Sequence, residues 1–232
     1  MKTSLRALLL DFDGVLADTE PIHLRLFQQV LKGEGITVAE PEYYEKYLGL
    51  DDRSFFEKIF KDRGKEIGAG KKEALIREKN EALLKQVSGG SLLLPGVVEF
   101  LQEARPKYHL AVVSGALRNE IQAVLKNAKI DDLFHLIVAA DDVSEGKPNP
   151  EGFLTAIRLL NRDAVPASEM LLAQECLAIE DSPWGIEAAK KAGVKCLALL
   201  TSYPREQLTG ADLFAANLQA VKWKEIEELF RR

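Results

Sequence analysis

Two aspartates stand two residues apart in the segment LLLDFDGVLADTE, residues 8–20. The apolar run Leu8–Leu10 is typical of a buried parallel strand, and it ends at Asp11 and Asp13. Carboxylates this close repel each other unless a cation holds them, and Mg²⁺ takes oxygen ligands while leaving positions for water and phosphate. One acid can then act as a nucleophile and the other as an acid/base, as phosphoryl transfer through an aspartyl-phosphate requires.

The same acidic pair has two simpler interpretations. Acidic pairs at strand ends are often only solvated loop residues. A calcium-binding loop is a second alternative, but Gly14 comes too early for that motif and Val15 stands where a ligand is needed. The choice therefore depends on whether matching groups follow other strands.

A hydroxyl group follows the strand candidate Leu110–Val113. The chain continues into Ser114, Gly115 and Ala116, and a helical pattern begins there. A hydroxyl and free backbone N–H groups at a helix start suit a phosphate oxygen. The simpler alternative is that Ser114 is only a helix N-cap.

A lysine lies in the turn Glu145–Pro150, which has the sequence EGKPNP. The prolines stiffen this turn, so the ammonium group of Lys147 is held and could neutralise a carboxylate and a phosphoryl group together. An isolated surface lysine usually has no such role. The Lys147–Pro148 bond is also a candidate cis peptide, because only proline makes that form accessible.

A second acidic pair follows the apolar run Leu177–Ile179. Glu180 and Asp181 could complete a metal shell, while Asp181 or Ser182 could cap the helix predicted over Gly185–Ala192, and both roles can hold at once. In a parallel α/β sheet the carboxyl ends of the strands point to one edge, where such folds bind ligands. We therefore expect the four clusters to meet at that edge.

Short apolar runs alternate with helical patterns along the chain. This alternation favours an α/β fold with a doubly wound, mostly parallel sheet. The predicted strands are Leu8–Leu10, Leu110–Val113, Leu136–Ala139, Leu177–Ile179 and Cys196–Leu200.

The interval between the first two strands is too long for one crossover helix. It carries only helical patterns, and these are Ile22–Leu31, Ser54–Phe60 and Lys71–Gln86. We therefore predict a helical domain over residues 19–90, inserted into an α/β core domain of residues 1–18 and 91–232. Hinges near Leu16–Thr19 and Gly89–Ser91 are expected to flex.

The bulk composition excludes several classes of protein. The chain has 232 residues, a hydrophobic fraction of 47% and a net charge of −5, which is the composition of a soluble globular protein. The acidic balance argues against a nucleic-acid surface, and no stretch is long enough to span a bilayer. Cys176 and Cys196 lie far apart in apolar runs, so we expect reduced core thiols and a cytoplasmic protein, as a monomer or weak dimer. The glycines of residues 33–35 and 68–72 match neither a dinucleotide fingerprint nor a phosphate loop.

Taken in order, the segments DFDGVLADTE, VVSGA, GKPNP and IEDSPWGIEAAKKAG resemble the haloacid dehalogenase-like superfamily. The resemblance is greatest to its phosphatases and β-phosphoglucomutases with a helical cap inserted after the first strand. Each segment alone is a weak signal, but the ordered set spans nearly the whole chain. The resemblance implies an enzyme that acts on a small phosphorylated metabolite with Mg²⁺ as cofactor, and it makes residues 19–90 the cap domain.

The resemblance also implies a role for each matching residue. Asp11 would be the nucleophile, and Asp13 would be the general acid/base that protonates the leaving oxygen. Asp11, the backbone carbonyl of Asp13 and Asp181 would hold the metal, with Glu180 orienting its waters. Asp13 argues against a dehalogenase, in which no leaving oxygen needs a proton. The residues that would bind the phosphoryl group are Ser114, Gly115, Ala116 and Lys147.

Two reactions stay open within the family. The leading hypothesis is a phosphatase of a small metabolite, with a sugar phosphate as the expected substrate, in which water attacks the aspartyl-phosphate. The alternative is a mutase, in which a second substrate hydroxyl attacks instead. Thr19, His23 and the segment Arg77–Asn80 with Lys79 resemble mutase cap positions. The simpler interpretation is a structural role for His23 and a solvated charge for Lys79.

The cap loop Gly49–Arg53 departs from the mutase pattern, which places an arginine three residues after the glycine. Asp52 occupies that position here and would repel a second phosphate, unless the loop shifts register and presents Arg53. The predicted substrate contacts are Thr19, His23, Arg53, Lys79, Arg118 and Asn119.

Two further hypotheses concern the rest of the chain. The connection Asn161–Gln174 is longer than is usual in the family and predicts an excursion or an extra contact surface. A non-catalytic interaction module that keeps only the fold is the third functional alternative. It would be supported by a lost nucleophile, lysine or metal-binding acid, and none of these is missing from the sequence.

Overall fold

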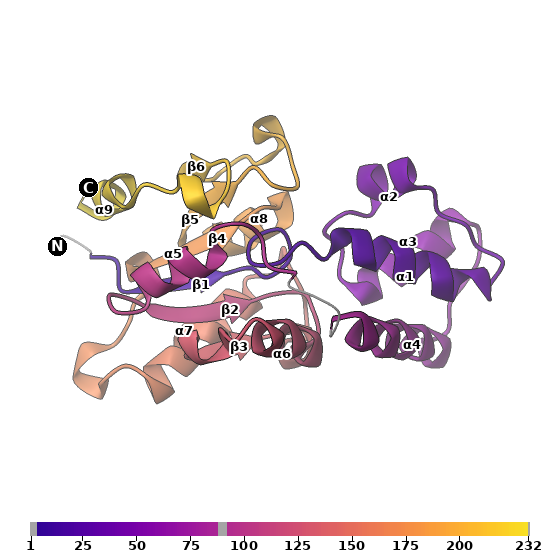
Figure 1. Cartoon of the computed structure of the whole chain (residues 1–232), viewed down its shortest axis with the longest axis horizontal. Coiled ribbons are helices and arrows are strands. Elements are labelled where there is room, and N and C mark those ends of the chain that lie inside the picture. Colours follow the sequence, from indigo (N-terminus) through magenta and orange to yellow (C-terminus); the bar gives the residue numbers. More distant parts are fainter. Residues whose placement is uncertain (1–3, 88–91, 232) are drawn as a thin grey trace. The chain divides into compact units, whose positions relative to one another are not determined.

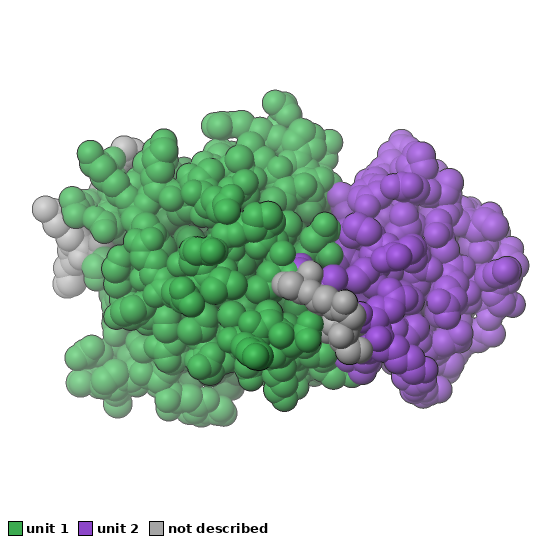
Figure 2. Space-filling view, in the orientation of Figure 1, with its two compact units in different colours: residues 1–18, 93–232 green, residues 19–92 purple. Residues whose placement is uncertain are grey.

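A computed structural model describes residues 4–87 and 92–231. The chain divides into two compact units, a core unit of Met1–Asp18 with Leu93–Arg232 and a helical unit of Thr19–Leu92 (Figure 2). The predicted hinge at Gly89–Ser91 lies outside the described residues.

The core unit is built on a parallel sheet (Figure 1). In the described part of the chain six strands form this sheet in the order β3-β2-β1-β4-β5-β6, and every neighbouring pair is parallel. The strands are β1 Ala7–Leu10, β2 His109–Val113, β3 Leu136–Val138, β4 Cys176–Glu180, β5 Lys195–Leu199 and β6 Leu213–Ala215. The reversal of strand order at β1 makes the sheet doubly wound, so the predicted fold class is confirmed, and the five predicted strands differ from those observed by one residue at most at either end.

Helices cover both faces of this sheet. Right-handed connections between parallel strands carry α7 and α8 to one face and α5 and α6 to the other. The core-unit helices are α5 Val97–Ala104, α6 Arg118–Asn127, α7 Glu151–Asp163, α8 Pro183–Lys191 and α9 Trp223–Arg231. Short 3₁₀ turns lie at Asp131–Leu133, Ala140–Asp142, Ala167–Glu169, Ala173–Glu175, Arg205–Gln207 and Leu218–Ala220.

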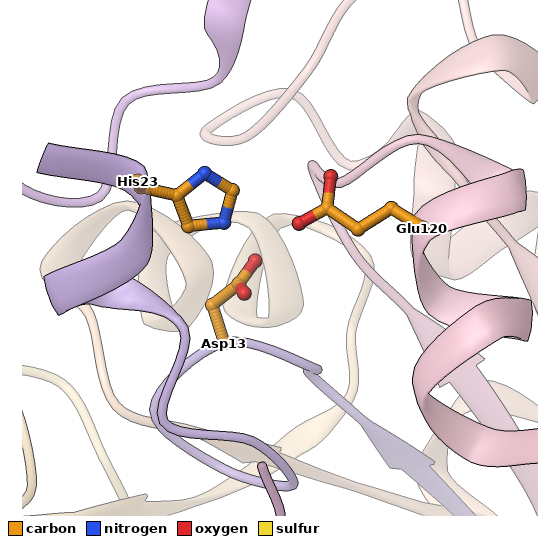
Figure 3. A group of neighbouring side chains, drawn as sticks. All are labelled: Asp13, His23 and Glu120. Carbon is orange, nitrogen blue, oxygen red and sulfur yellow. The ribbon is translucent and has the colours of Figure 1, made fainter. Parts of the chain in front are cut away.

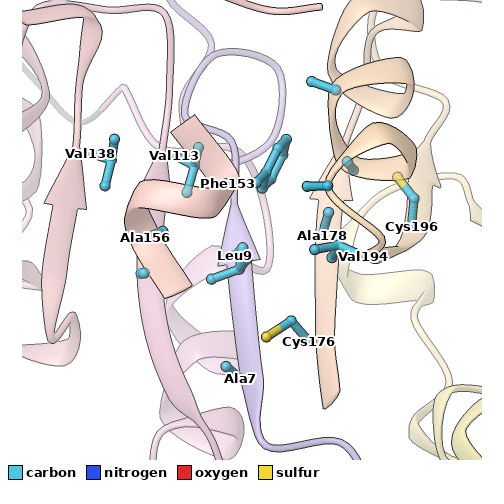
Figure 4. Packing of buried hydrophobic residues seen from close by; sticks show 14 of the residues in the cluster. Ala7, Leu9, Val113, Val138, Phe153, Ala156, Cys176, Ala178, Val194 and Cys196 are labelled. Atoms are coloured by element: carbon cyan, nitrogen blue, oxygen red, sulfur yellow. The ribbon is translucent and has the colours of Figure 1, made fainter. Parts of the chain in front are cut away.

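The hydrophobic core lies between the sheet and its helices. Because side chains alternate along a strand, Ala7 and Leu9 of β1 point to one face and Leu8 and Leu10 to the other, and all are fully buried. Ala7 and Leu9 belong to the same core cluster as Phe153 of α7 (Figure 4). Strands buried on both faces explain why the sequence shows apolar runs here without polar alternation.

The two cysteines lie in this core. Cys176 and Cys196 are free, buried thiols, as predicted. Burial raises the pKa of the Cys176 thiol to about 12, which keeps it protonated and unreactive. Among the residues that the structure describes, no helix has both the length and the apolar character needed to cross a membrane.

The helical unit is held together by an aromatic cluster. Its helices are α1 Glu20–Lys32, α2 Glu40–Lys46, α3 Asp52–Asp62 and α4 Ala69–Val87. Phe27 of α1 stacks on Phe55 of α3 with ring centroids 3.6 Å apart, and the ring of Phe56 meets it edge-on at 5.5 Å. Asp51 caps α3 by accepting a hydrogen bond of 2.9 Å from the backbone N–H of Ser54.

The long connection after α7 contains short turns. Asn161 lies on α7, and its side chain accepts from the Leu171 backbone N–H at 2.7 Å and donates to the Leu171 carbonyl at 3.0 Å. Arg6 donates to the carbonyl of Glu169 at 2.7 Å. The predicted excursion Asn161–Gln174 is thus tied to the end of α7 through Asn161 and to the segment before β1 through Arg6.

A histidine pair lies at the opposite end of the sheet from the strand ends that carry the acids. His135 Nδ1 accepts a hydrogen bond from the Leu110 backbone at 3.1 Å, and its Nε2 lies 3.4 Å from Nδ1 of His109. Burial lowers the pKa of both imidazoles, and the nearby positive charge of Arg105 lowers both further. The folded protein therefore favours the neutral form of the pair.

This pair predicts a specific loss of stability in mild acid. An unfolded histidine takes up a proton near its ordinary pKa of about 6.5, whereas the folded pair resists it. Above that pH the pair does not lower the free energy of unfolding. As pH falls below it, proton uptake by the unfolded chain lowers the free energy of unfolding. Between pH 7.5 and 5.5 we expect the midpoint of urea unfolding to fall more for the native protein than for His135→Asn. Equal pH dependence of the two proteins would contradict this role.

Candidate active site

The loop after β1 begins the site. The backbone N–H of Asp11 donates to the Ile179 carbonyl of β4 at 2.9 Å, which fixes the acid beside the neighbouring strand. Gly14 turns the chain with a φ of +71°, a conformation that favours glycine. A Cβ atom at this position would lie 1.8 Å from Oδ2 of Asp181, so glycine is also required for space.

Three carboxylates gather where β1 and β4 end. Oxygen atoms of Asp11, Glu180 and Asp181 lie within 4.8 Å of one another, and all three residues are buried. The register that pairs Leu10 with Ile179 places the strand ends level, so neighbouring strands deliver these acids to one point. The sequence prediction that the two acidic segments meet at one edge of the sheet agrees with this geometry.

Lys147 bridges two of these acids. Its Nζ lies 2.8 Å from Oδ1 of Asp11 and 2.6 Å from Oε1 of Glu180. Burial disfavours the ammonium charge, but the two carboxylates outweigh that effect and raise the pKa of Lys147 above its ordinary value. The lysine is therefore charged at neutral pH. The Lys147–Pro148 bond is cis, as the sequence suggested.

The charge of the cluster is not balanced. Burial raises the pKa of Glu180 to about 7, although Lys147 opposes this. Burial together with the negative charges of Asp11 and Glu180 raises the pKa of Asp181 well above its usual range. With all three carboxylates ionised, as a bound cation requires, the ammonium of Lys147 would leave a net charge of −2. A divalent cation with oxygen ligands, such as Mg²⁺, fits this donor set in both charge and chemistry.

Glu180 is held by the first turn of α8. The Ser182 hydroxyl donates to Oε2 of Glu180 at 3.2 Å and accepts from the Gly185 backbone N–H at 3.0 Å. Ser182 therefore caps the helix and supports the acid together. A Cβ atom at Gly185 would lie 1.9 Å from the Glu180 carboxylate, so this glycine makes the space in which Glu180 lies.

The Ser114 turn follows β2, the strand next to β1. The backbone N–H of Ser114 donates to the Val138 carbonyl at 3.0 Å, and the Ser114 hydroxyl accepts from the backbone N–H of Ala116 at 3.1 Å. Ser114 is buried and Gly115 is partly exposed. The turn thus lies at the same sheet edge as the carboxylates, and its role in binding phosphate stays a prediction.

Two residues of α6 depart from the sequence analysis, which predicted a substrate contact for Arg118 and no role for Glu120. The Arg118 guanidinium donates to the Ile137 carbonyl at 2.7 Å and to Asp142 at 2.5 Å, so it has a structural role, and its predicted contact with substrate is untested. Glu120 was not singled out, because an acid on a helix is usually solvated. It is buried, and one of its carboxylate oxygens lies within 4.8 Å of one of Asp13 (Figure 3, which also draws His23 of the helical unit).

The segment after β5 was also missed. The hydroxyl of Thr201 donates to the Gly14 carbonyl at 2.6 Å, and the hydroxyl of Ser202 donates to Oδ2 of Asp181. Nothing in the residue types of this segment marks it, since threonine and serine are common in loops. Only the sheet topology, which places β5 beside β4, brings these hydroxyls to the acids.

Two of the predicted substrate contacts, Lys79 and Arg53, form ion pairs within the helical unit. Lys79 is fully buried, and its Nζ lies 2.5 Å from Oδ1 of Asp52 and 4.6 Å from the centre of the Phe27 ring. Arg53 is exposed and lies 3.7 Å from Glu73. Two further candidates, Thr19 and His23, are buried at the start of α1. Their contact with substrate stays a prediction, as does that of Asn119.

The fold and the carboxylate–lysine cluster define an α/β enzyme with an acidic site at the carboxyl edge of its sheet. The chain belongs to the haloacid dehalogenase-like hydrolase family, whose model matches residues 8–199. The family expected from the sequence is therefore confirmed, and the protein is an enzyme of that family.

Individual relatives cover most of the chain. Protein CbbY of Rhodobacter capsulatus is 30% identical over 236 residues, covering 97% of this chain and 99% of that protein. Validoxylamine A 7'-phosphate phosphatase of Streptomyces hygroscopicus is 33% identical over 137 residues, covering 59% of this chain and 60% of that one. The solved structure of β-phosphoglucomutase from Clostridium difficile has a TM-score of 0.84 at 25% identity, with 97% of each chain covered.

The space at Gly185 gives a direct test of the carboxylate cluster. In Gly185→Ala the new methyl group displaces the Glu180 carboxylate and loosens its pairing with Lys147. We expect catalytic activity on a phosphate ester to fall about 10- to 100-fold, the usual effect of disturbing groups that orient metal ligands. The melting temperature should change little, because the end of a flexible side chain is what moves.

Gly70→Ala is the matched control for this variant. Gly70 also lies in the first turn of a helix, but a Cβ atom there meets nothing within 4 Å. Its activity should equal that of the native protein. Full activity in Gly185→Ala would show that Glu180 does not need its observed position.

Proposed function

We propose that the protein is a Mg²⁺-dependent phosphatase that hydrolyses a small phosphorylated metabolite, of the sugar phosphate class, through an aspartyl-phosphate. The observation that carries the proposal is the buried cluster of Asp11, Glu180 and Asp181 around Lys147. Such a cluster can hold a cation and a phosphoryl group at once, which a purely structural ion pair does not require. Membership of the hydrolase family supports the same reaction class.

The metal would be held by Asp11, Asp181 and the backbone carbonyl of Asp13, with Glu180 orienting its waters. When bound, it would neutralise charge on the phosphoryl oxygens during transfer. Lys147 adds a fixed positive charge, since its ammonium lies 2.8 Å from Asp11. The Ser114 hydroxyl and the turn through Gly115 and Ala116 would bind the remaining phosphoryl oxygens.

The chain's own residues perform the two half-reactions. In the first, a carboxylate oxygen of Asp11 attacks phosphorus, the bond from phosphorus to the ester oxygen breaks, and Asp13 gives its proton to that oxygen. In the second, Asp13 takes a proton from water as the water oxygen attacks the aspartyl-phosphate. The bond from phosphorus to the Asp11 oxygen breaks, inorganic phosphate leaves, and Asp11 is regenerated as a carboxylate.

Residues 19–90, which make up nearly all of the helical unit, are proposed as the cap that admits substrate and then excludes water. Substrate contacts in this proposal are Thr19, His23, Arg53, Lys79, Arg118 and Asn119. The reduced, buried thiols of Cys176 and Cys196 support a cytoplasmic location. A monomer or weak dimer stays the expected state.

A β-phosphoglucomutase-like reaction is the second candidate, supported by the likeness to the clostridial mutase structure. The ion pair between Asp52 and the fully buried Lys79 argues against it. A lysine whose charge is already neutralised by a carboxylate binds a second phosphate poorly, because that carboxylate repels the phosphate. The pair therefore favours hydrolysis of monophosphates over a reaction that must hold a bisphosphate.

Removing the nucleophile tests the proposed mechanism. Asp11→Asn keeps the shape of the side chain but cannot form the aspartyl-phosphate, so phosphate release should fall at least ~10⁴-fold. The variant should stay folded, since it removes one buried negative charge. Asp163→Asn, at an exposed aspartate at the end of α7, is the matched control and should keep full activity. Turnover by Asp11→Asn close to the native rate would exclude Asp11 as the nucleophile.

A panel of phosphorylated metabolites separates the two reactions. Purified protein is assayed for phosphate release with Mg²⁺ and with a chelator, and the panel includes β-glucose 1-phosphate with and without the 1,6-bisphosphate primer. We expect metal-dependent phosphate release from one or a few esters without primer. Primer-dependent conversion to glucose 6-phosphate with little free phosphate would instead establish the mutase.

A further inference from the structure

Two hydroxyl groups in the segment after β5 contact the loops that carry the acidic site. The Thr201 hydroxyl donates to the carbonyl of Gly14 at 2.6 Å, and the Ser202 hydroxyl donates to Oδ2 of Asp181. The backbone N–H of Leu200 donates to the Ala215 carbonyl of β6 at 3.0 Å, so the segment starts from a fixed point. Three loops, after β1, β4 and β5, are thereby joined side by side.

These contacts leave little room for movement. A Cβ atom at Gly14 would lie 1.8 Å from Oδ2 of Asp181 and 2.7 Å from Oγ of Ser202. The register that pairs Glu180 with Ala198 fixes where β4 and β5 end relative to each other, and so where the loops after these strands begin. The hydroxyl of Ser202 thus meets the Asp181 carboxylate from a segment that follows a strand paired with β4.

The hydrogen bond acts on one oxygen of the carboxylate only. With Oδ2 of Asp181 engaged by Ser202, the carboxylate has one preferred rotation. A carboxylate turned at random would have to be ordered when a cation binds, at a cost in free energy. A donor that orders it beforehand removes that cost.

We propose that Ser202 is a positioning residue that orients Asp181 for the divalent cation, while Thr201 holds the facing Gly14 loop. The proposal rests on the proposed function, because it assumes that the acidic cluster binds Mg²⁺. It does not require Ser202 to touch the cation or the substrate. Its consequence is measurable in metal affinity, without turnover.

The experiment is calorimetric titration of Mg²⁺ into purified protein in the absence of substrate. Native protein is compared with Ser202→Ala, which lacks the donor, with Ser202→Cys, which keeps the shape but donates weakly, and with Ser202→Thr, which restores the hydroxyl. We expect the dissociation constant to rise about 10-fold or more in the alanine and cysteine variants. The threonine variant should stay within about threefold of the native value.

Ser54→Ala is the matched control. Its hydroxyl also donates to an aspartate, Oδ2 of Asp51 at 2.9 Å, but it does so in the helical unit. Its Mg²⁺ affinity should equal that of the native protein. Circular dichroism checks the fold of each variant, and the cysteine and threonine variants decide the result where alanine fails to fold.

The outcomes separate this proposal from the proposed function. Native-like Mg²⁺ affinity in folded Ser202→Ala or Ser202→Cys, or a threonine variant as weak as alanine, would overturn the role of Ser202 and leave the phosphatase mechanism standing. Failure of the native protein to bind Mg²⁺ at millimolar concentration would overturn both. Weaker binding on loss of the donor, with rescue by threonine, supports both.

Discussion

Three buried carboxylates share one ammonium group at the edge of the sheet, and the site is arranged around this imbalance of charge. Two unit charges about 4.8 Å apart interact with about 3–4 kcal/mol at an effective dielectric constant of about 20. Repulsion of this size among Asp11, Glu180 and Asp181 is comparable with the free energy of several ordinary hydrogen bonds, and the Lys147 ammonium contacts two of the three acids. Burial raises the pKa of Glu180 to about 7, and the negative charge of Asp11 adds to this rise while Lys147 opposes it. A cation-binding role follows from this imbalance more directly than from any single residue.

The surrounding backbone fits closely around the acids. Gly14 and Gly185 both lie where a methyl group would overlap a carboxylate, at 1.8 and 1.9 Å. Hydroxyl groups of Ser182 and Ser202 then fix the rotation of Glu180 and Asp181. Small residues supply the space and serines supply the donors, while the parallel strands set the separation. The site is thus rigid through its sheet and not through packing of its own side chains.

The sequence predicted the groups that are local to one strand end and missed those that depend on distant segments. Asp11 and Asp181 come within two residues of an apolar run and Lys147 lies in a proline-stiffened turn, so their residue types and positions already indicated a shared edge. The support from Ser202 depends on β5 lying beside β4, and a serine after a strand carries no such signal. The short strand β6 and helix α2 were missed, because three and seven residues give little periodicity. Arg118 shows the converse, since a residue that matched a family contact is engaged by Asp142.

Stability and reactivity are also separated between parts of the chain. The sheet is buried on both faces. Leu8 and Leu10 lie on one face, and Leu9 lies on the other, where Phe153 of α7 packs. Each such side chain contributes about 1.5–3 kcal/mol through burial. In the proposed function, a cation at 100 times its dissociation constant would add only about 2.7 kcal/mol to the free energy of unfolding. The apolar sheet therefore supplies far more stability than the metal site could. A fold with that reserve tolerates a charged cluster that is unfavourable by itself, such as the one formed by Asp11, Glu180 and Asp181.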